Sequence, residues 1–429
     1  MAARRRIATP SREPAPSRIE RDSIGEIEVP AGALYGIRTI RSIRNLSFSG
    51  RVLGAYPLYV RALAIVKKAA ARANHDAGVI KPRIADAIEA ACDALIAGAH
   101  LDQFPVDVLA GGGGIAVNMN LNEVIANLAC ERLGRVRGSY DPVDPKLHVN
   151  ASQSTADVCH TAARIAIIEQ WSELQPVLDG CVSAARAKAK QFRNIQTLAR
   201  TCLQDASAVS LGEMFGAYAT AIARRAGALD RTVATLRKIN LGGTVIGDGS
   251  GAPSTYRGVV VGHLNRLIKH PLSLRENLFD AAQNIDDIVA VSAQLGMLAE
   301  VLIKIAQDLR LLSSGPEGGF GEIILPAVQE GSSFFPGKIN PVIPETMLQC
   351  CFQVLGCERA ARLALERGEL NLNVFEGAAA INVMDAMAML TRAVASFTDA
   401  CLRGIVANQA RCHELAAIAG RRAKSRGKE

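Results

Sequence analysis

A seven-residue repeat of large aliphatic side chains is the clearest pattern in the chain, and it spans residues 286–312. Successive members are alternately three and four residues apart, which places them on one stripe of an α-helix. A sustained repeat of this period predicts near-parallel, left-handed packing against other helices in a bundle. The repeat consists of Ile288, Val291, Leu295, Leu298, Leu302, Ile305, Leu309 and Leu312.

The positions beside this stripe are also unusually apolar, and they include Met297, Val301 and Ile303. An amphipathic surface helix with one buried stripe is the alternative. A helix that is apolar almost all round is, however, expected at the centre of a fold. We therefore expect 286–312 to form a central helix, part of whose surface is covered by neighbouring subunits.

Helical patterns also account for much of the remaining chain. Residues 58–97 have a helical periodicity that is interrupted near Gly78 and Pro82, and a Gly-rich bend at 111–114 precedes a further helical stretch. Long helices dominate residues 156–410. The composition agrees with helix-on-helix packing, because 49% of the 429 residues are hydrophobic and only 4% are aromatic.

These patterns predict a mainly α fold, in which a long central helical bundle follows a smaller, mixed N-terminal domain. We expect a disordered basic tail at 1–20, the N-terminal domain at 21–155 and the bundle at 156–410. A short C-terminal remnant with a basic tail is expected at 411–429. A chain of this length can bury a large core.

The net charge of +8 resides in the two ends of the chain. Residues 1–18 hold five arginines and one glutamate, and residues 421–429 hold five basic residues and Glu429, so each end carries +4. The segment between them is formally neutral, whereas a nucleic-acid-binding protein needs a basic face on its folded body. Binding of nucleic acid through the tails is the alternative, but we expect solvated tails and no nucleic-acid partner.

The cysteine pattern indicates a reducing compartment. Ten cysteines occur without a CxxC pair or a regular framework, and several lie in apolar helical stretches, among them Cys350, Cys351 and Cys357. We expect buried free thiols and a cytoplasmic location. A hydrophobic signal region and an uncharged apolar run of about 18 residues are both lacking, so no membrane partner is expected. The arginine-rich start leaves an organelle transit peptide as an alternative.

The segment Gly331–Glu345 carries the densest set of chemically active groups. It joins two helical stretches and holds two serines, a lysine, an asparagine and a glutamate among glycines and prolines. Five residues separate Gly331 from Gly337, and Ile339 replaces the hydroxyl residue that follows the lysine of a P-loop, so phosphate binding of that type is excluded. A structural Gly/Pro loop is the alternative to a site where a serine acts as a base near a lysine.

Three further loops are rich in polar groups or glycine. Four glycines at 111–114 suggest a close backbone approach to an anion, and an ordinary helix-entry turn fits them equally well. Gln153, Ser154 and Thr155 either donate hydrogen bonds to a carboxylate or cap the long helix that follows. The third loop is 200–205.

The segment Gly331–Glu345 resembles the signature of the aspartase/fumarase superfamily of β-eliminating lyases. It matches the pattern G-S-S-x-x-P-x-K-x-N-P-x-x-x-E at every specified position. Within that superfamily the chain is most similar to the aspartate ammonia-lyases, and the similarity extends over roughly residues 19–412. Further segments with counterparts in the family are 104–108, 117–120, 122–127, 153–155, 203–206, 239–242 and 311–316.

This resemblance implies a three-part subunit with a long helical bundle. Four subunits would combine their bundles into one core as a homotetramer, and loops from three chains would form each shared active site. The family's small helical third domain is expected to be truncated, since only a basic tail follows Gly420. The resemblance also implies a small carboxylate substrate and no need for a metal or an organic cofactor.

The chemistry that the resemblance implies is anti elimination. A base takes a proton from the carbon next to a carboxylate, ammonia leaves the neighbouring carbon, and an aci-carboxylate forms that needs preorganised donors. Ser332 would be the base on a mobile loop, with Lys338 as its catalytic partner and a carboxylate held by Lys338 and Asn340. The other implied residues are Ser154, Thr155, Ser333 and Asn120 as substrate contacts, Thr201 beside them, and Glu345 and Gln204 in support.

Several positions depart from the family pattern. Ile115 and Ala116 replace Thr and Ser, Ala156 replaces Asn, and Cys202 replaces His or Gln. Glu317 replaces a usual Arg. The expected activity is the conversion of L-aspartate to fumarate and ammonia. The alternatives are a diverged C–N or C–O lyase for another substituted succinate or amino acid, and a non-catalytic homologue.

Overall fold

The computed structural model describes residues 16–426, with the backbone alone at 420 and 422–426. Two compact units make up the chain, and each draws on three separate stretches of sequence. Segments 239–283 and 369–377 belong to the first unit, whereas the sequence analysis assigned them to the bundle. The first unit comprises the described residues up to Ala163, Ile239–Gln283 and Glu369–Gly377; the second comprises Arg164–Lys238, Asn284–Gly368 and the described residues from Ala378 onward.

A β-hairpin begins the first unit. Strand β1 (Ser17–Asp22) pairs antiparallel with β2 (Gly25–Pro30), and Asp22 lies opposite Gly25 at the turn. The Asp22 carboxylate accepts hydrogen bonds from the backbone N–H groups of Ile24 and Gly25, which closes the turn. The expectation of a disordered tail is therefore wrong for residues 17–20, and residues 1–15 lie outside the described part of the chain.

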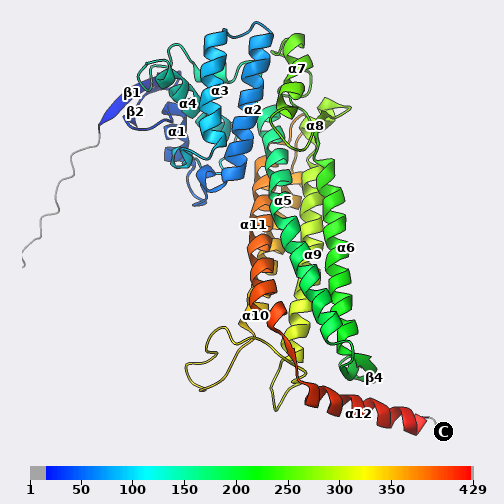
Figure 1. Cartoon of the computed structure of the whole chain (residues 1–429). Coiled ribbons are helices and arrows are strands. Elements are labelled where there is room, and N and C mark those ends of the chain that lie inside the picture. Colours follow the sequence, from blue (N-terminus) through cyan, green and yellow to red (C-terminus); the bar gives the residue numbers. More distant parts are fainter. Residues whose placement is uncertain (1–15, 427–429) are drawn as a thin grey trace, which may run out of the picture. The chain divides into compact units, whose positions relative to one another are not determined.

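Helices form most of the rest of the first unit (Figure 1). The predicted break near Gly78 and Pro82 is confirmed, because α2 (Pro57–Asp76) ends before Gly78 and α3 (Pro82–Ile96) begins at Pro82. Proline fits the first turn of a helix, where its missing N–H has no partner to lose. The other elements wholly within this unit are α1 (Ile37–Leu46), η1 (Leu53–Ala55), η2 (Leu101–Gln103), α4 (Ile115–Arg132), η3 (Pro145–Val149), α7 (Ser254–Asn265), β6 (Ser273–Leu274), which pairs with β5 (Lys238–Ile239), and α8 (Leu278–Gln283).

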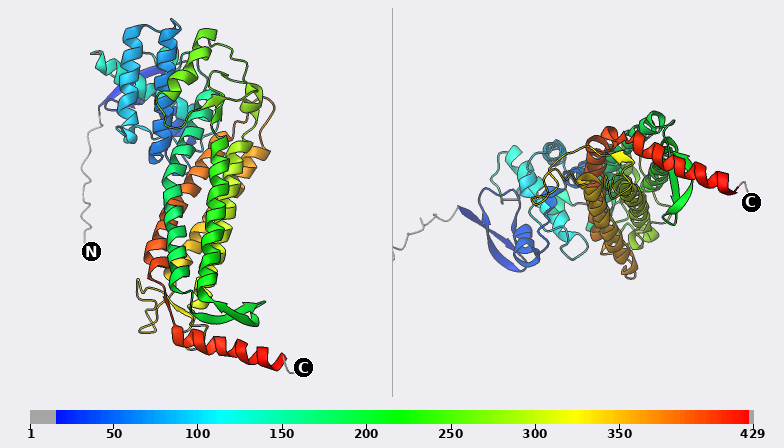
Figure 2. Two further views of the ribbon diagram at one scale, coloured as in Figure 1. Left: turned by 45° about the vertical axis from the view of Figure 1, so that its right-hand side comes forward. Right: turned by 90° about the horizontal axis from the view of Figure 1, so that it is seen from below.

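Long helices run alongside one another in the second unit, as Figures 1 and 2 show. The aliphatic repeat forms α9 (Asp286–Leu312), with the predicted boundaries, and all eight stripe residues are buried. Helix α9 packs against α6 (Leu211–Thr235) and α10 (Val342–Glu366). Most of α5 (Thr155–Gln191) and α11 (Glu376–Ala400) completes the bundle. The prediction of a mainly α fold with a long helical bundle is confirmed.

Helices α9 and α11 are apolar and long enough to cross a membrane by composition alone. In each, 56% of the most apolar window is buried by the rest of the protein, as is usual for core helices. Coverage of α9 is incomplete, however, because Met297 is 44% exposed and Val301 and Ile303 are half-buried. Within the part of the chain that the structure describes, the central helix thus stays partly accessible outside its buried stripe.

Polar side chains of α5 fix its position against two other bundle helices. Trp171 Nε1 donates to Asp230 Oδ1 of α6 at 2.9 Å. Arg164, which is fully buried, donates to Asp287 of α9 through both Nε (2.8 Å) and Nη2 (2.7 Å). A buried guanidinium needs such a paired carboxylate, because an isolated charge in an apolar interior is very costly.

One end of the bundle gathers a hairpin, two loops and a terminal helix (Figures 1 and 2). Strands β3 (Gln196–Thr201) and β4 (Gln204–Ser210) form the hairpin, and Leu198 of β3 packs with Leu415 and Ala419 of α12 (Gln409–Arg426). The sequence analysis expected a short remnant and a basic tail here, and the structure corrects this with a helix that continues to Arg426. The remaining short elements are β7 (Ile323–Ile324), its partner β8 (Val406–Ala407) and η4 (Leu402–Gly404).

Candidate active site

The predicted site residues fall into three local groups. One group lies in the first unit, and the other two lie in the hairpin β3–β4 and in the connection between α9 and α10 of the second unit. The first group is Asn120, Ser154 and Thr155, the second is Thr201 and Gln204, and the third is Ser332, Ser333, Lys338, Asn340 and Glu345.

The loop that begins at Gly331 is closed by hydrogen bonds at its base. The Gly331 N–H donates to the Lys338 carbonyl oxygen at 2.8 Å, and Asn340 Nδ2 donates to the Gly331 carbonyl oxygen at 2.6 Å. A Cβ atom at position 331 would lie 2.4 Å from the Lys338 oxygen, so only glycine allows this approach. Asn340, which was predicted to hold a carboxylate, thus uses one amide hydrogen in this loop contact and has a second amide hydrogen to donate.

Ser332 lies at the base of this loop, where its hydroxyl is an acceptor. The backbone N–H groups of Phe334 and Phe335 donate to Ser332 Oγ at 3.0 and 2.8 Å. Two such donors stabilise negative charge on that oxygen and favour its deprotonated form.

The tip of the loop presents two aromatic rings that the sequence analysis did not single out. Phe334 is 79% and Phe335 is 59% exposed, and their ring centroids lie 4.9 Å apart in an edge-to-face arrangement. Lys338 and Ser333 are exposed as well. At the far end of the connection Glu345, in the first turn of α10, pairs with Arg310 of α9 at 3.4 Å, which suits a supporting role.

The tip of the β3–β4 hairpin has an unusual backbone. Cys202 and Leu203 both have positive φ angles, +52° and +57°, between the paired residues Thr201 and Gln204. Glycine, asparagine and aspartate are the usual residues of such a turn, so two other residues there indicate strain. Thr201, Cys202 and Gln204 are all exposed, and Leu203 is 71% exposed. The expectation that the cysteines are buried is therefore wrong for Cys202.

The other cysteines fit that expectation to different degrees. All ten are free thiols, and six of them are buried. The thiols of Cys159, Cys350 and Cys357 are half-buried. Burial raises the pKa of Cys351 to about 12, as expected for an unreactive core thiol.

A buried carboxylate anchors the base of the hairpin. Glu322, with no exposed surface, pairs with Arg200 at 2.6 Å and accepts a hydrogen bond from Thr197 Oγ1. The Arg200 guanidinium also stacks on Phe320, 4.1 Å from the ring centroid. These contacts attach β3 to the loop that follows α9.

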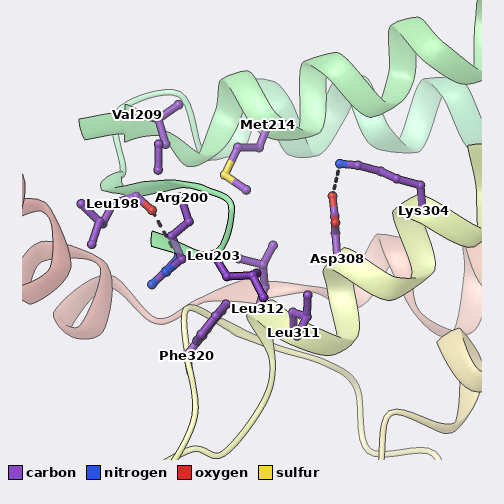
Figure 3. A pocket seen from close by; sticks show the side chains of 11 residues that line it. Leu198, Arg200, Leu203, Val209, Met214, Lys304, Asp308, Leu311, Leu312 and Phe320 are labelled. Carbon is purple, nitrogen blue, oxygen red and sulfur yellow. Dashed lines mark hydrogen bonds and ion pairs between the residues drawn. The ribbon is translucent and has the colours of Figure 1, made fainter. Parts of the chain in front are cut away.

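A cavity of about 310 Å³ lies beside this anchor (Figure 3). Its wall is largely aliphatic, with Leu203 and Leu312 among the lining residues, and its charged side chains are paired. Lys304 pairs with Asp308 on one side of the cavity, and Arg200 lies on the other side, as Figure 3 shows. The ion partner of Arg200 is Glu322. None of the predicted catalytic residues lines this cavity, so we assign it no chemistry.

In the first unit, the helices α4 and α5 begin close together. Asn118 Nδ2 in the first turn of α4 donates to Thr155 Oγ1, the first residue of α5, at 2.8 Å. Gly114 provides no side-chain cap for α4, and the first backbone N–H groups of a helix have no partner within the helix itself. Ile115 is 43% exposed and Ala116 is buried at this helix start. The arrangement offers a half-buried hydroxyl and backbone donors to an anion.

The other two predicted residues of this group have local roles. Ser154 Oγ accepts a hydrogen bond from the Ala156 N–H at 3.2 Å, so it caps α5, which was one of the two interpretations of this segment. Asn120 is fully buried and its Nδ2 donates to the Gln103 carbonyl oxygen at 3.0 Å. The amide of α4 that reaches Thr155 belongs to Asn118, two residues earlier.

Sequence reasoning missed a buried polar cluster beneath Thr155. The Lys67 side chain, fully buried in α2, donates to Asn150 Oδ1 at 2.8 Å, and burial lowers the pKa of this amine from 10.5 to about 7. Burial raises the pKa of Asp157 to about 6, although the N–H groups of Gly242 and Thr244 donate to its carboxylate. A lysine within the apolar run of α2 was the available signal for this cluster.

Comparison with known proteins places the chain in a family. A model of a lyase family matches residues 25–356. The chain belongs to the aspartase/fumarase superfamily of lyases. This lyase is 42% identical over 397 residues to an aspartate ammonia-lyase of Helicobacter pylori, covering 92% of this chain and 85% of that protein. Over 402 residues it is 43% identical to an aspartate ammonia-lyase of Pseudomonas aeruginosa, covering 94% and 85%.

Solved structures of the superfamily have the same fold as this lyase. A fumarate lyase:delta crystallin from Brucella melitensis, bound to cobalt, superimposes with a TM-score of 0.91 at 43% identity, covering 93% of this chain and 86% of that one. A class II fumarase from Schistosoma mansoni gives a TM-score of 0.90 at 29% identity, covering 93% and 87%. Relatives with different names therefore share one architecture, and the choice of substrate must lie in local residues.

Proposed function

We propose that this lyase converts L-aspartate to fumarate and ammonia. The observation that carries the proposal is the complete signature loop, in which Ser332 Oγ accepts two backbone hydrogen bonds. Support comes from relatives named aspartate ammonia-lyase at 42–43% identity over more than nine-tenths of the chain. A non-catalytic homologue would have no need to keep this loop intact.

In the proposed mechanism, Ser332 Oγ as an alkoxide takes a proton from the carbon next to one substrate carboxylate. The electron pair of that C–H bond moves onto the carboxylate as an aci-carboxylate and then forms the double bond as the C–N bond breaks. Ammonia leaves with the electron pair of that bond, and the serine later returns its proton to solvent. Donors held at the carboxylate before the reaction lower the barrier, and Lys338, Asn340 and Thr155 are the proposed donors.

Assembly as a homotetramer with shared active sites is part of this proposal. Met297 of α9 is exposed in the single chain, and Val301 beside it is half-buried. Arg224 and Arg225 of α6 and Glu300 of α9 line the same shallow surface, so opposite charges flank the apolar strip. Light scattering on the purified protein tests the assembly, and a monomeric mass would contradict it. We propose a cytoplasmic location because an exposed thiol such as Cys202 suits a reducing compartment.

A second candidate is elimination from a less polar substrate. Ile115 is 43% exposed at the start of α4, where the family has a hydroxyl residue, and Ala156 follows Thr155 where the family has an amide. Loss of one donor to a developing oxyanion costs about 2.7–4 kcal/mol unless another group replaces it. A panel of other amino acids and substituted succinates tests this candidate.

The experiment that separates these functions measures product with purified protein. L-Aspartate should yield fumarate and ammonia in equal amounts, followed by the absorbance of fumarate and an independent ammonia assay. Product from another member of the panel, and none from L-aspartate, would support the second candidate. No product from any substrate would overturn both and favour the non-catalytic homologue.

A further inference from the structure

A continuous set of hydrogen bonds in the first unit joins the buried Lys67 to Thr155. Lys67 Nζ donates to Asn150 Oδ1 at 2.8 Å, and Asn118 Nδ2 donates to the same oxygen at 3.0 Å. Asn118 Nδ2 also donates to Thr155 Oγ1 at 2.8 Å. Lys67 is fully buried and Asn118 is 1% exposed, so water does not compete at these two positions.

The direction of these hydrogen bonds follows from groups that have only one role. The Gln153 carbonyl oxygen can only accept, and Asn150 Nδ2 donates to it at 3.1 Å. The Asn150 oxygen therefore faces the other way, toward Lys67 and Asn118, and accepts a hydrogen bond from each of them. Asn118 must then turn its amide nitrogen toward Asn150, and the same nitrogen reaches Thr155.

This polarity determines what the Thr155 hydroxyl does. Since Oγ1 accepts from Asn118, its hydrogen must point away from that amide. No acceptor for this hydrogen occurs among the described residues, and Thr155 is half-buried at the start of α5. The hydroxyl is thus set to donate toward the space at the two helix starts, where N–H groups favour an anion.

We propose that Lys67, Asn150 and Asn118 are positioning residues that hold the Thr155 hydroxyl as a hydrogen-bond donor to a substrate carboxylate. The inference rests on the proposed function, in which Thr155 contacts the substrate. A donor that is already oriented needs no rearrangement when charge develops on the carboxylate, which is how such groups lower a barrier. The three residues act through Thr155 and do not touch the substrate.

Asn122 provides a matched control on the same helix. It is fully buried, and its Nδ2 donates to the same Asn150 oxygen at 3.2 Å. Unlike Asn118, it has no hydrogen bond to Thr155 in the described structure. A purely structural loss should therefore look alike at Asn118 and Asn122, whereas a loss that acts through Thr155 should appear at Asn118 alone.

A double-mutant cycle tests the proposal on the full-length protein. Thr155→Val and Asn118→Leu are each expected to lower kcat/KM for L-aspartate by about 10- to 100-fold, mostly through kcat. The double variant should be no worse than the poorer single variant within about twofold, because both remove the same donor. For Asn122→Leu combined with Thr155→Val, the two fold-losses in kcat/KM should instead multiply. Thr155→Ser keeps the hydroxyl and should retain most of the activity.

Independent losses in the Asn118–Thr155 cycle, as in the Asn122 control, would overturn the inference. If Asn118→Leu fails to fold, Asn118→Ala replaces it in the same cycle. Succinate binding, measured by calorimetry, separates this inference from the proposed function. Wild type that binds succinate but forms no fumarate contradicts the function alone, and the cycle is then measured in the Kd for succinate. Wild type that does neither overturns both.

Discussion

Arg164 and Asp287 form a two-pronged ion pair between α5 and α9, with Nε–Oδ2 and Nη2–Oδ1 distances of 2.8 and 2.7 Å. The arginine has no exposed surface and the aspartate is 8% exposed. Such a pair adds little net stability over apolar residues of the same size, but removal of one partner leaves a buried charge alone. The pair thus makes the alignment of these two helices intolerant of single changes.

Asp287→Ala should therefore destabilise the protein by about 3–5 kcal/mol, measured as the free energy of unfolding in urea. The exposed pair of Arg403 and Asp399, 3.0 Å apart on α11 and the turn after it, is the control. Arg403→Ala should change stability by less than about 1 kcal/mol. Equal losses in the two variants would contradict the role given to the buried pair.

The buried amine of Lys67 should make stability depend on pH. Its folded pKa is lowered from 10.5 to about 7, so between these values the unfolded chain binds the proton and the folded chain does not. Stability from this group therefore rises as the pH increases from 7 toward 10.5. Lys67→Met should remove this rise, so the stability of wild type relative to the variant should increase by up to about 1.4 kcal/mol per pH unit.

Urea unfolding of both proteins at pH 7, 8 and 9 measures this effect. This pH range lies above the titration of Asp157, whose pKa is raised to about 6 in the folded protein. Its effect, a fall in stability with increasing pH, is confined to pH 3.8–6. The buried thiol of Cys159, with a pKa raised to about 12, is still protonated there in the folded protein. A constant difference between wild type and Lys67→Met across pH 7–9 would contradict the prediction.

Strain in the β3–β4 hairpin should be removable. Leu203 has a φ of +57° and is 71% exposed, so its side chain gains little burial to offset the strain. Leu203→Gly is expected to stabilise the protein by about 1 kcal/mol, measured as an increase in Tm. Ala208→Gly in β4, where φ is not positive, should lower stability instead. A decrease in Tm for both variants would show that the turn is not strained.

The sequence predicted the bundle well because its signal is local and periodic. Helix α9 begins and ends where the aliphatic repeat does, and proline and glycine mark the break between α2 and α3. The C-terminal helix α12 was missed because its sequence is rich in basic residues and only a few apolar positions in it pack on Leu198. That contact joins residues far apart in the chain, and no local pattern reports it.

The candidate site shows the same division. A contiguous motif made Ser332 and its loop recognisable, and the structure adds the two backbone N–H groups that donate to Ser332 Oγ. The support beneath Thr155 comes from Lys67, Asn118 and Asn150 on three separate elements, so spacing along the chain gives no hint of it. Asn118 and Asn120 belong to one sequence motif but have different partners, since Asn118 donates to Thr155 and Asn120 donates to the Gln103 carbonyl oxygen. The motif alone does not reveal this difference.

The aromatic tip of the signature loop should matter for activity and not for folding. Phe334 and Phe335 are largely exposed, so replacing both by alanine should change the free energy of unfolding by less than about 0.5 kcal/mol. If the loop closes over the substrate, the exposed rings become buried on closure, and their loss should raise KM for L-aspartate. Steady-state kinetics checks this, and an unchanged KM and kcat would argue against closure on these rings.

The most direct test of the account is the rate of fumarate formation from L-aspartate by wild type and by Ser332→Ala at equal protein concentration. Equal Tm values for the two proteins serve as the control for folding. Removal of the base should lower kcat by about 10²- to 10⁴-fold while the protein still binds succinate. A Ser332→Ala variant that retains wild-type kcat would contradict the assignment of Ser332 as the base.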